Sequence, residues 1–328
     1  MNRIYEIELS AKPQESKNRL LRGTARIRRR LSAFVAEIRR NWQSYALIAP
    51  YFFLFFGFVV LSVLIAVGFS FTHFNILEPP VFVGWSNYAR LFLEDDVFLI
   101  AVKNTLLFVA ITGPFSYILC FTIAWFVNEL NPRIRSILTL MFYAPSLAGP
   151  STFIIWQTIF SGDSYGLANG ILMKLGILLE PVLWLKDPAY ILGILILVQL
   201  WLSLGASFLS FIAGLQTIDK SLYEAGAIDG IRNRWQELWY ITLPVMRPFL
   251  MFGAVIQITA SFAVSAVSLG LLGFPTTNYA GRTIVTHLVD YGQVRFEMGY
   301  ASAIATLLFV VMVSVNKLVQ RYLRHIGS

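Results

Sequence analysis

The stretch ALIAPYFFLFFGFVVLSVLIAVGFS, residues 46–70, contains 25 residues and no charged side chain. With a rise of 1.5 Å per residue, an α-helix of this length is longer than the roughly 30 Å hydrocarbon core of a bilayer. Further uncharged runs follow at 104–127, 137–160, 190–213, 249–273 and 299–316. The sequence therefore predicts an all-α polytopic membrane protein with about six transmembrane helices.

The composition agrees with this class. Of the 328 residues, 57% are hydrophobic and 13% are charged, whereas soluble domains carry about 25% charged residues. The first run begins only after 45 residues and lacks a small-x-small cleavage site, so we do not expect a cleaved signal peptide. The single cysteine, Cys120, excludes a disulfide within the chain.

Lysine and arginine are distributed unevenly among the segments that connect the runs. The segments 1–45, 128–136, 214–248 and 317–328 hold 20 of the 26 basic residues, and the alternate segments hold 6. Each set holds 9 acidic residues. The positive-inside rule therefore predicts that both termini and the segment 214–248 are cytoplasmic. This bias explains the net charge of +8 better than nucleic-acid binding does.

These patterns divide the chain into a basic cytoplasmic tail at 1–45, a transmembrane domain at 46–320 and a short cytoplasmic tail at 321–328. Within the first tail, GTARIRRRLSAFVAEIRR (23–40) repeats apolar residues at helical spacing among arginines. This pattern is typical of an interfacial helix on an anionic leaflet, and equally of a plain positive-inside anchor.

The six runs lack the groups that most membrane chemistry requires. They contain no Asp, Glu, Lys, Arg or His, and the sequence has no G-x-x-x-x-G-K-[ST] phosphate loop. We therefore expect no catalytic residue, no metal site and no cofactor in this chain. A proton-coupled carrier would need charged relays in the membrane. A secondary carrier coupled to sodium could use carbonyls and hydroxyls, and it remains the alternative.

Neutral polar residues form two rows with the same i, i+4, i+8, i+11 spacing, which places each row on one helix face. One row lies in 190–213 and the other in 249–273. Serines alone are typical of helix packing, but a buried glutamine without partners is costly. The rows predict a hydrated pathway for a hydroxyl-rich solute. The candidate pathway residues are Gln199, Trp201, Ser203, Gln257 and Ser261.

The segment 214–248 interrupts the apolar pattern with a predicted helix–turn–helix. Ser221 to Glu224 matches a capping box, and Asp219 is a second possible cap. Asp229–Gly230 is a turn signal. A second capping box at Asn233 and Gln236 would precede an apolar patch of Trp235, Leu238 and Trp239. We expect a docking site, because spans without charges imply that energy comes from another protein; a self-packed connector is the alternative.

The residues EAGAIDG (224–230) and ITLP (241–244) resemble the EAA motif of permease subunits of bacterial ABC sugar importers, the maltose-type, binding-protein-dependent family. VGWSNYARLF (83–92), NTLLF (104–108) and MGYASAIA (298–305) also agree, and the resemblance covers about 45–320. Two departures are visible. Gly226 replaces the usual second alanine, and the ten residues between Gly230 and Ile241 are one more than the family pattern has.

The resemblance implies a type I ABC importer permease, a non-catalytic translocation subunit of the bacterial cytoplasmic (inner) membrane. It implies a second permease, usually non-identical, two ATP-binding cassette subunits that bind ATP and Mg²⁺, and an extracytoplasmic solute-binding protein. The resemblance also implies that 214–248 is the coupling loop. The substrate would be a sugar or oligosaccharide. Serines and glutamines accept any polyol, so the residues do not distinguish a neutral sugar from a uronic one. The residues implied in coupling to the ATPase are Glu224, Ala225, Gly226, Asp229 and Gly230.

Overall fold

The structure is a computed structural model that describes residue 37 and residues 40–149 and 151–324. Its contacts divide the chain into two compact units, Met1–Ile65 and Ala66–Ser328. Apart from residues 37 and 40, the predicted interfacial helix at 23–40 lies outside the described residues. The first uncharged run forms one apolar helix of 28 residues, Trp42–Phe69. It consists of α2 (Trp42–Phe55), the π-helical turn η1 (Phe56–Val60) and α3 (Leu61–Phe69).

The described residues form four helices that are long and apolar enough to cross a membrane, or up to six if each of two bent helix pairs is one span. This agrees with the predicted number of about six. After Trp42–Phe69, the long helices are α5 (Asp96–Asn128), α9 with α10 (Pro188–Leu202, Ala206–Gln216) and α17 (Met298–Arg324). One bent pair is α6 (Pro132–Leu147) with α7 (Ser151–Ile159), and the other joins α12 and α13 (Arg234–Glu237, Leu243–Val245) to α14 (Arg247–Phe262).

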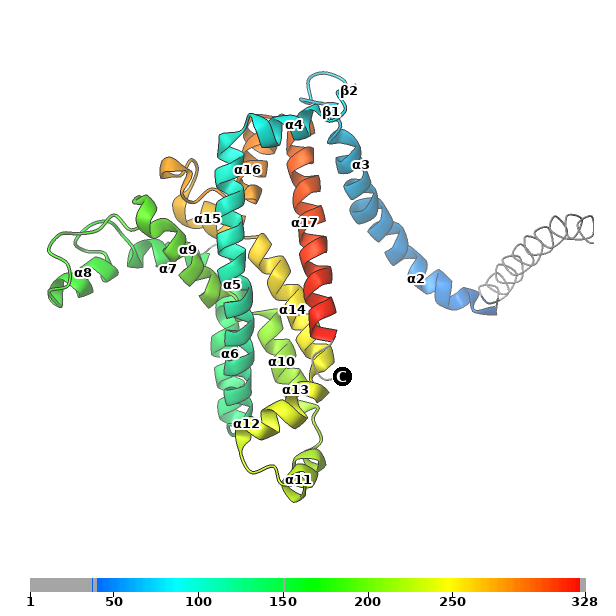
Figure 1. Cartoon of the computed structure of the whole chain (residues 1–328), viewed down its shortest axis with the longest axis vertical. Helices are drawn as coiled ribbons and strands as arrows, with labels where there is room; N and C mark the ends of the chain where they lie inside the picture. The colour runs from blue at the N-terminus through cyan, green and yellow to red at the C-terminus, as the bar shows by residue number, and fades with distance from the viewer. Residues whose placement is uncertain (1–36, 38–39, 150, 325–328) are drawn as a thin grey trace, which may run out of the picture. The chain divides into compact units, whose positions relative to one another are not determined.

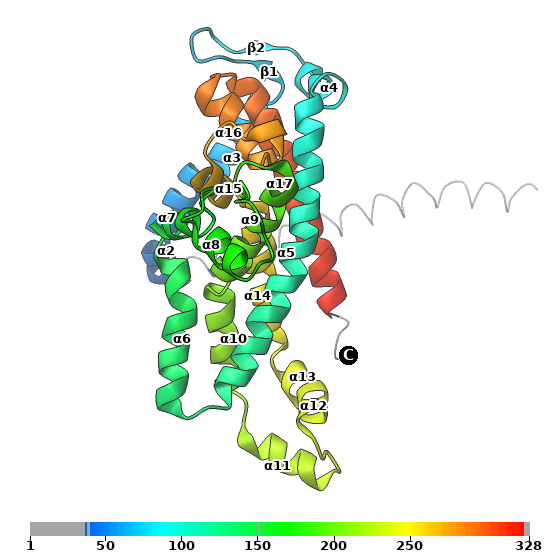
Figure 2. The same cartoon turned by 90° about the vertical axis from the view of Figure 1, so that its left-hand side faces the viewer.

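Within the unit 66–328, α5 is the helix around which the bundle packs. It contacts α10 and α14, and α14 also contacts α17, so these four helices lie side by side (Figures 1 and 2). The buried residues of α5 recur every three or four positions, which places them on one face. Many of them are small, which allows close helix approach. They include Ala101, Thr105, Thr112, Ser116, Cys120 and Ala124.

The two ends of this bundle carry different elements (Figure 1). One end, the α16 end, carries the antiparallel pair β1–β2 (Thr72–His73, Val81–Phe82), α4 (Ser86–Leu93), α16 (Ile284–Val289) and the π turn η4 (Asp290–Val294). The opposite end, the α11 end, carries α11 (Lys220–Ile228), α12 and the π turn η2 (Leu238–Thr242). The connections also contain α8 (Leu167–Lys174), α15 (Ser265–Leu272) and η3 (Thr277–Tyr279).

The fourth and fifth uncharged runs do not form the unbroken helices that the sequence predicted. α9 ends at Leu202 and α10 begins at Ala206, while α14 ends at Phe262 and α15 begins at Ser265. Each predicted polar row is therefore divided between two helices. The interruptions expose backbone carbonyls that need partners inside a membrane.

Candidate functional site

The segment between α10 and α14 folds as the predicted helix–turn–helix. Asp219 is the N-cap of α11, where its carboxylate accepts the backbone N–H of Ser221 at 3.0 Å. This hydrogen bond lowers the pKa of Asp219. Because α11 begins at Lys220, the other suggested start, a capping box at Ser221 and Glu224, is wrong.

A Schellman motif ends α11. The N–H of Ile231 donates to the carbonyl of Gly226 at 2.9 Å, and the N–H of Gly230 donates to that of Ala227 at 3.4 Å. Gly230 has φ of +97°, a left-handed conformation that glycine adopts freely and that strains a β-branched residue. The predicted turn at Asp229–Gly230 is thus confirmed, and Gly230 is the residue on which it depends.

Gly226 is buried where α11 packs against the second helix. A Cβ at this position would lie 2.7 Å from Cδ1 of Ile241 and 3.0 Å from Cδ1 of Ile231, which is closer than ordinary contact. Glycine in place of alanine therefore allows the two helices to approach. Gly226 supports the segment from inside, whereas the other predicted coupling residues are exposed: Glu224, Ala225, Asp229 and Gly230.

The second helix contains a π turn. Asn233 is the N-cap of α12, as predicted, and its side chain accepts the N–H of Gln236 at 2.8 Å. From Leu238 to Thr242 the helix becomes η2 and then returns to α-helix in α13. A π turn holds one extra residue within an α-helix. We therefore expect η2 to absorb the additional residue between Gly230 and Ile241.

Apolar side chains cover the outer surface of this segment. Ile228 is 87% exposed, Tyr240 72%, Trp235 63% and Trp239 62%. These four residues are here called the α11–α12 apolar face. Leu238 is buried, so the prediction that it shares a patch with Trp235 and Trp239 is wrong. Large exposed apolar side chains in one patch are typical of a surface that another protein or the membrane covers.

A cavity of about 770 Å³ separates α11 and α12 from the turn between α5 and α6. Glu224 and Arg234 both line it. Arg234 lies 3.7 Å from Glu129 and 2.9 Å from Glu237, in exposed ion pairs that contribute at most about 1 kcal/mol each. Glu224 has no ion pair among the described residues, so its carboxylate is available at this surface.

The predicted pathway residues Ser203, Gln257 and Ser261 are buried around the break between α9 and α10. The Nε2–H of Gln257 donates to the carbonyl of Ser203 at 3.2 Å and to Sγ of Cys120 at 3.0 Å. The Cys120 thiol donates to the same carbonyl at 3.3 Å. The Ser261 hydroxyl donates to the carbonyl of Gln257 at 2.9 Å. These side chains satisfy the backbone of the bundle.

The other two predicted pathway residues lie on α9 outside this network. Gln199 is nearly buried, and its side chain makes no hydrogen bond within the part of the chain that the structure describes. Trp201 is half-buried and packs edge-to-face on Trp156, with ring centroids 5.4 Å apart. The structure therefore joins Ser203, Gln257 and Ser261, and it leaves Gln199 with unused hydrogen-bonding capacity.

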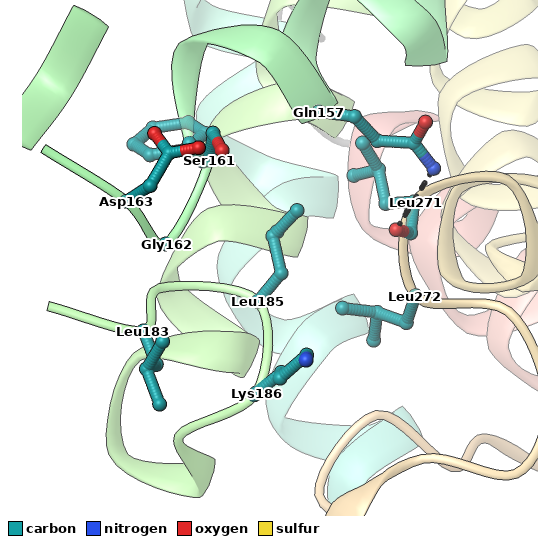
Figure 3. A pocket seen from close by; sticks show the side chains of 10 residues that line it. Gln157, Ser161, Gly162, Asp163, Leu183, Leu185, Lys186, Leu271 and Leu272 are labelled. Carbon is teal, nitrogen blue, oxygen red and sulfur yellow. Dashed lines mark hydrogen bonds between the residues drawn. The ribbon is translucent and has the colours of Figure 1, made fainter. Parts of the chain in front are cut away.

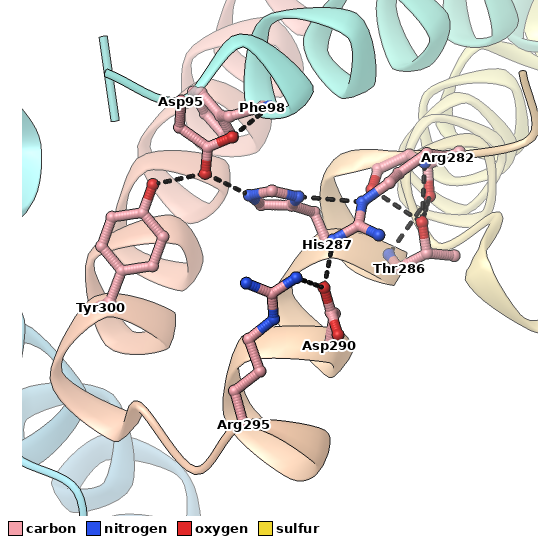
Figure 4. Close-up of polar contacts among 9 residues, drawn as sticks. Asp95, Phe98, Arg282, Thr286, His287, Asp290, Arg295 and Tyr300 are labelled. Carbon is pink, nitrogen blue, oxygen red and sulfur yellow. Dashed lines mark hydrogen bonds and ion pairs between the residues drawn. The ribbon is translucent and has the colours of Figure 1, made fainter. Parts of the chain in front are cut away.

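A buried charged cluster lies at the α16 end, and the sequence analysis missed it (Figure 4). Asp95 is the N-cap of α5 and accepts the N–H of Phe98 at 2.9 Å and the hydroxyl of Tyr300 at 2.8 Å. Its Oδ2 lies 3.0 Å from Nε2 of His287. The Nε–H of Arg282 donates to Nδ1 of His287 at 3.0 Å. Nδ1 is thus an acceptor, and the ring proton lies on Nε2, toward Asp95.

Charge in this cluster is balanced around a neutral His287. Burial lowers the pKa of His287, and the Arg282 charge acts in the same direction, while Asp95 opposes both. Burial alone would raise the pKa of Asp95, but hydrogen bonds from Tyr300 and Phe98 outweigh it and lower that pKa. Arg282 and Arg295 both pair with the buried Asp290. Among the described residues, no group of three or more His, Cys, Asp or Glu side chains could hold a metal ion.

The chain matches a known protein family over most of its length. The sequence model of the family described as "binding-protein-dependent transport system inner membrane component" matches residues 116–325. The probable ABC transporter permease protein YesP of Bacillus subtilis is 30% identical over 83% of this chain and 87% of that protein. The arabinooligosaccharides transport system permease protein AraP of the same organism is 32% identical over 83% of this chain and 85% of that protein.

The fold also matches a solved structure. One chain of a bacterial alginate ABC transporter, solved in complex with an alginate pentasaccharide-bound periplasmic protein, has a TM-score of 0.74. It is 25% identical, and the match covers 89% of this chain and 97% of that chain.

We expect the stability of the fold to decrease on acidification because His287 is held neutral. The unfolded chain protonates this histidine as the pH falls below about 6.5, whereas the folded chain does so only at lower pH. The contribution of neutral His287 to the free energy of unfolding is therefore complete above about pH 6.5 and decreases as the pH falls below that value. The lowered pKa of Asp95 adds a further loss as the pH falls below about 3.8. Thermal unfolding of the detergent-solubilised protein between about pH 5 and 7.5 measures the first slope.

His287→Gln is the matched variant for this measurement. Glutamine retains a donor toward Asp95 and an acceptor toward Arg282 but does not titrate, so the melting temperature should depend less on pH between 5 and 6.5. His73→Gln, at an exposed position on β1, should leave the slope unchanged. An unchanged slope in His287→Gln would contradict the assignment.

Deletion of Tyr240 should convert η2 into ordinary α-helix. A π turn differs from α-helix by one inserted residue. After the deletion, the residues on either side of η2 should therefore stay on the same helix faces, and the free energy of unfolding should change by less than about 1 kcal/mol. Deletion of Ala225 would instead rotate the end of α11 by about 100° and disrupt the Schellman motif. Thermal unfolding of both deletion variants gives the comparison. Equal destabilisation by the two deletions would show that η2 does not absorb an extra residue.

Proposed function

The chain belongs to the family of binding-protein-dependent transport system inner membrane components, and from this premise we propose that it forms a translocation pathway for a sugar or oligosaccharide. It is a multi-pass membrane protein and a permease subunit of an ABC transporter. We propose that a second permease completes the pathway and that two ATPase subunits bind and hydrolyse ATP with Mg²⁺. An extracytoplasmic binding protein would deliver the solute. The relatives named for arabinooligosaccharides and alginate support a saccharide cargo.

The observation that carries this proposal is the exposed helix–turn–helix at the α11 end. Its apolar face and the exposed carboxylate of Glu224 lie on the surface, while Gly226 and the Schellman turn at Gly230 fix its shape. An apolar surface with one accessible charge fits docking to another protein that offers a basic group. We propose that Glu224, Ala225, Asp229 and Gly230 meet the ATPase and that Gly226 acts from inside.

For the pathway, we propose separate roles for the candidate residues. Gln199 and Trp201 on α9 would contact the solute, because Gln199 has unused hydrogen-bonding capacity and Trp201 is half-buried. Ser203, Gln257 and Ser261 would hold the helix break that shapes the pathway, because their polar atoms are engaged with backbone carbonyls.

Disruption of the docking segment should separate the ATPase from an intact permease. Glu224→Lys reverses the accessible charge, and loss of a desolvated pair should cost at least about 2 kcal/mol of binding. Gly230→Val strains the left-handed turn without a clash, since a Cβ there would lie more than 4 Å from every described residue except its chain neighbours. Co-purification of the ATPase, followed by ATP hydrolysis stimulated by the loaded binding protein, should decrease in both variants.

The matched controls lie in the segment 161–189, away from α11 and α12. Gly176 also ends its helix in a Schellman motif, with φ of +70° and open space around it, so Gly176→Val imposes the same strain away from α11. Glu180→Lys repeats the charge reversal. Both controls should retain the ATPase. Normal coupling in Glu224→Lys and Gly230→Val would make the segment a plain connector.

We further propose that the α11 end and both termini face the cytoplasm, as the basic-residue distribution indicates. Ile228 and Tyr165 are 87% and 93% exposed and lie on opposite sides in this topology. A membrane-impermeant maleimide added to intact cells should label Tyr165→Cys and should label Ile228→Cys only after permeabilisation. Labelling of Ile228→Cys in intact cells would reverse the orientation.

A further inference from the structure

A second cavity, of about 490 Å³, lies between α7, α15 and the loops that flank α8, and is here called the α7 pocket (Figure 3). Phe160, Leu271 and Leu272 are among its apolar lining residues. A few polar residues share the lining: Gln157, Ser161, Asp163 and Lys186. A cavity of this volume, with apolar walls and few polar groups, has the composition of a small-molecule site.

The loops around the pocket are held in place by one buried side chain, that of Asn169. Its amide N–H groups donate to the carbonyls of Ser161 at 3.1 Å, Asp163 at 3.0 Å and Val182 at 3.0 Å. Its Oδ1 accepts the indole N–H of Trp184 at 2.8 Å. The two loops that flank α8 are thereby fixed to each other before any ligand arrives, and such preorganisation reduces the entropic cost of binding.

The polar groups of the pocket retain hydrogen-bonding capacity of both kinds. Oδ1 of Asp163 accepts the N–H groups of Tyr165 and Gly166, which leaves Oδ2 as an acceptor. Nε2 of Gln157 donates to backbone carbonyls at the end of α15, which leaves Oε1 as an acceptor. Lys186 has no ion-pair partner among the described residues. The pocket thus offers carboxylate and amide acceptors together with an ammonium donor.

An aromatic row connects the pocket to α9. Phe160 in the pocket wall stacks on Trp156, with centroids 5.8 Å apart and planes at 11°, and Trp156 packs on Trp201. The indole Nε1 of Trp156 is buried and has no hydrogen-bond partner within 40–149 and 151–324. Aromatic faces attract the positively polarised C–H groups of a sugar ring, and a free indole N–H can donate to a hydroxyl. The row ends at Trp201, one of the proposed pathway residues.

We propose that the α7 pocket is a subsite for one neutral sugar unit of the transported oligosaccharide, and this inference rests on the proposed function. Sugar hydroxyls both donate and accept, so one ring offers partners to Asp163 and to Lys186. A uronate would gain attraction at Lys186 and meet repulsion at Asp163. In the proposed topology these loops face the side on which the binding protein delivers its cargo.

Protection of a pocket cysteine in the complete transporter tests the proposal. Ser161→Cys places a thiol in the pocket, and Tyr165→Cys places one on the same loop outside it. The rate of maleimide labelling of this chain is followed by mass spectrometry, with the wild-type chain and its buried Cys120 as the blank. A neutral oligosaccharide should slow labelling at position 161 and leave position 165 unchanged.

Charge variants added to Ser161→Cys identify the groups that bind. Lys186→Gln and Asp163→Asn should each raise the half-protecting oligosaccharide concentration by roughly 2- to 13-fold, the loss expected for one hydrogen bond. Asparagine at 163 retains Oδ1 for the loop. Lys174→Gln and Glu180→Gln, outside the pocket lining, are the matched controls and should change nothing.

The outcomes separate this subsite from the proposed function. Uptake of a neutral oligosaccharide into proteoliposomes without protection at position 161 would overturn the subsite and leave the transport function intact. Stronger protection by a uronic oligosaccharide of equal length would overturn the assignment to a neutral sugar. Failure of both oligosaccharides in uptake and in protection would overturn the proposed function together with the subsite.

Discussion

The carbonyl oxygen of Ser203, at the break between α9 and α10, is the acceptor at which three helices of the bundle meet. The backbone N–H of Gly205 donates to it locally, at 2.8 Å. In hydrocarbon, an unsatisfied backbone group costs several kcal/mol. Gln257 on α14 and Cys120 on α5 both donate to this oxygen, at 3.2 Å and 3.3 Å. Three segments that are far apart in the sequence therefore meet at one acceptor. The small residues along α5 follow from the same constraint, because a short amide or thiol reaches the carbonyl only if the helices approach closely.

This constraint links the two candidate sites physically. α11 packs on η2 through Gly226 and Ile241, η2 continues through α13 into α14, and α14 carries Gln257. Docking at the α11 end would therefore act on a continuous path of packed elements that ends at the Ser203 break. Such a path carries coupling where its elements have two arrangements.

The sequence predicts the spans and the helix–turn–helix because both depend on local patterns. Runs without charge identify the spans, and Asn233 and Asp229–Gly230 carry their capping and turn signals within a few residues. It also identifies Gln257 as exceptional, but it could not supply the partner, because Ser203 looks like any other serine in an apolar run. The sequence does not predict the buried charged cluster at the α16 end for the same reason. Asp95 and His287 are 192 residues apart, and each alone resembles a loop residue in solvent.

The two departures from the EAA pattern have one structural explanation. An extra residue after Gly230 would rotate everything that follows by about 100° if the helix remained α-helical, and Ile241 would leave the surface of α11. If the π turn of η2 absorbs that residue, as we expect, Ile241 stays against α11, where its Cδ1 occupies the space that a Cβ at position 226 would need. Glycine at 226 is thus the complement of the insertion. On this account the longer spacing and the missing methyl group are linked through Ile241.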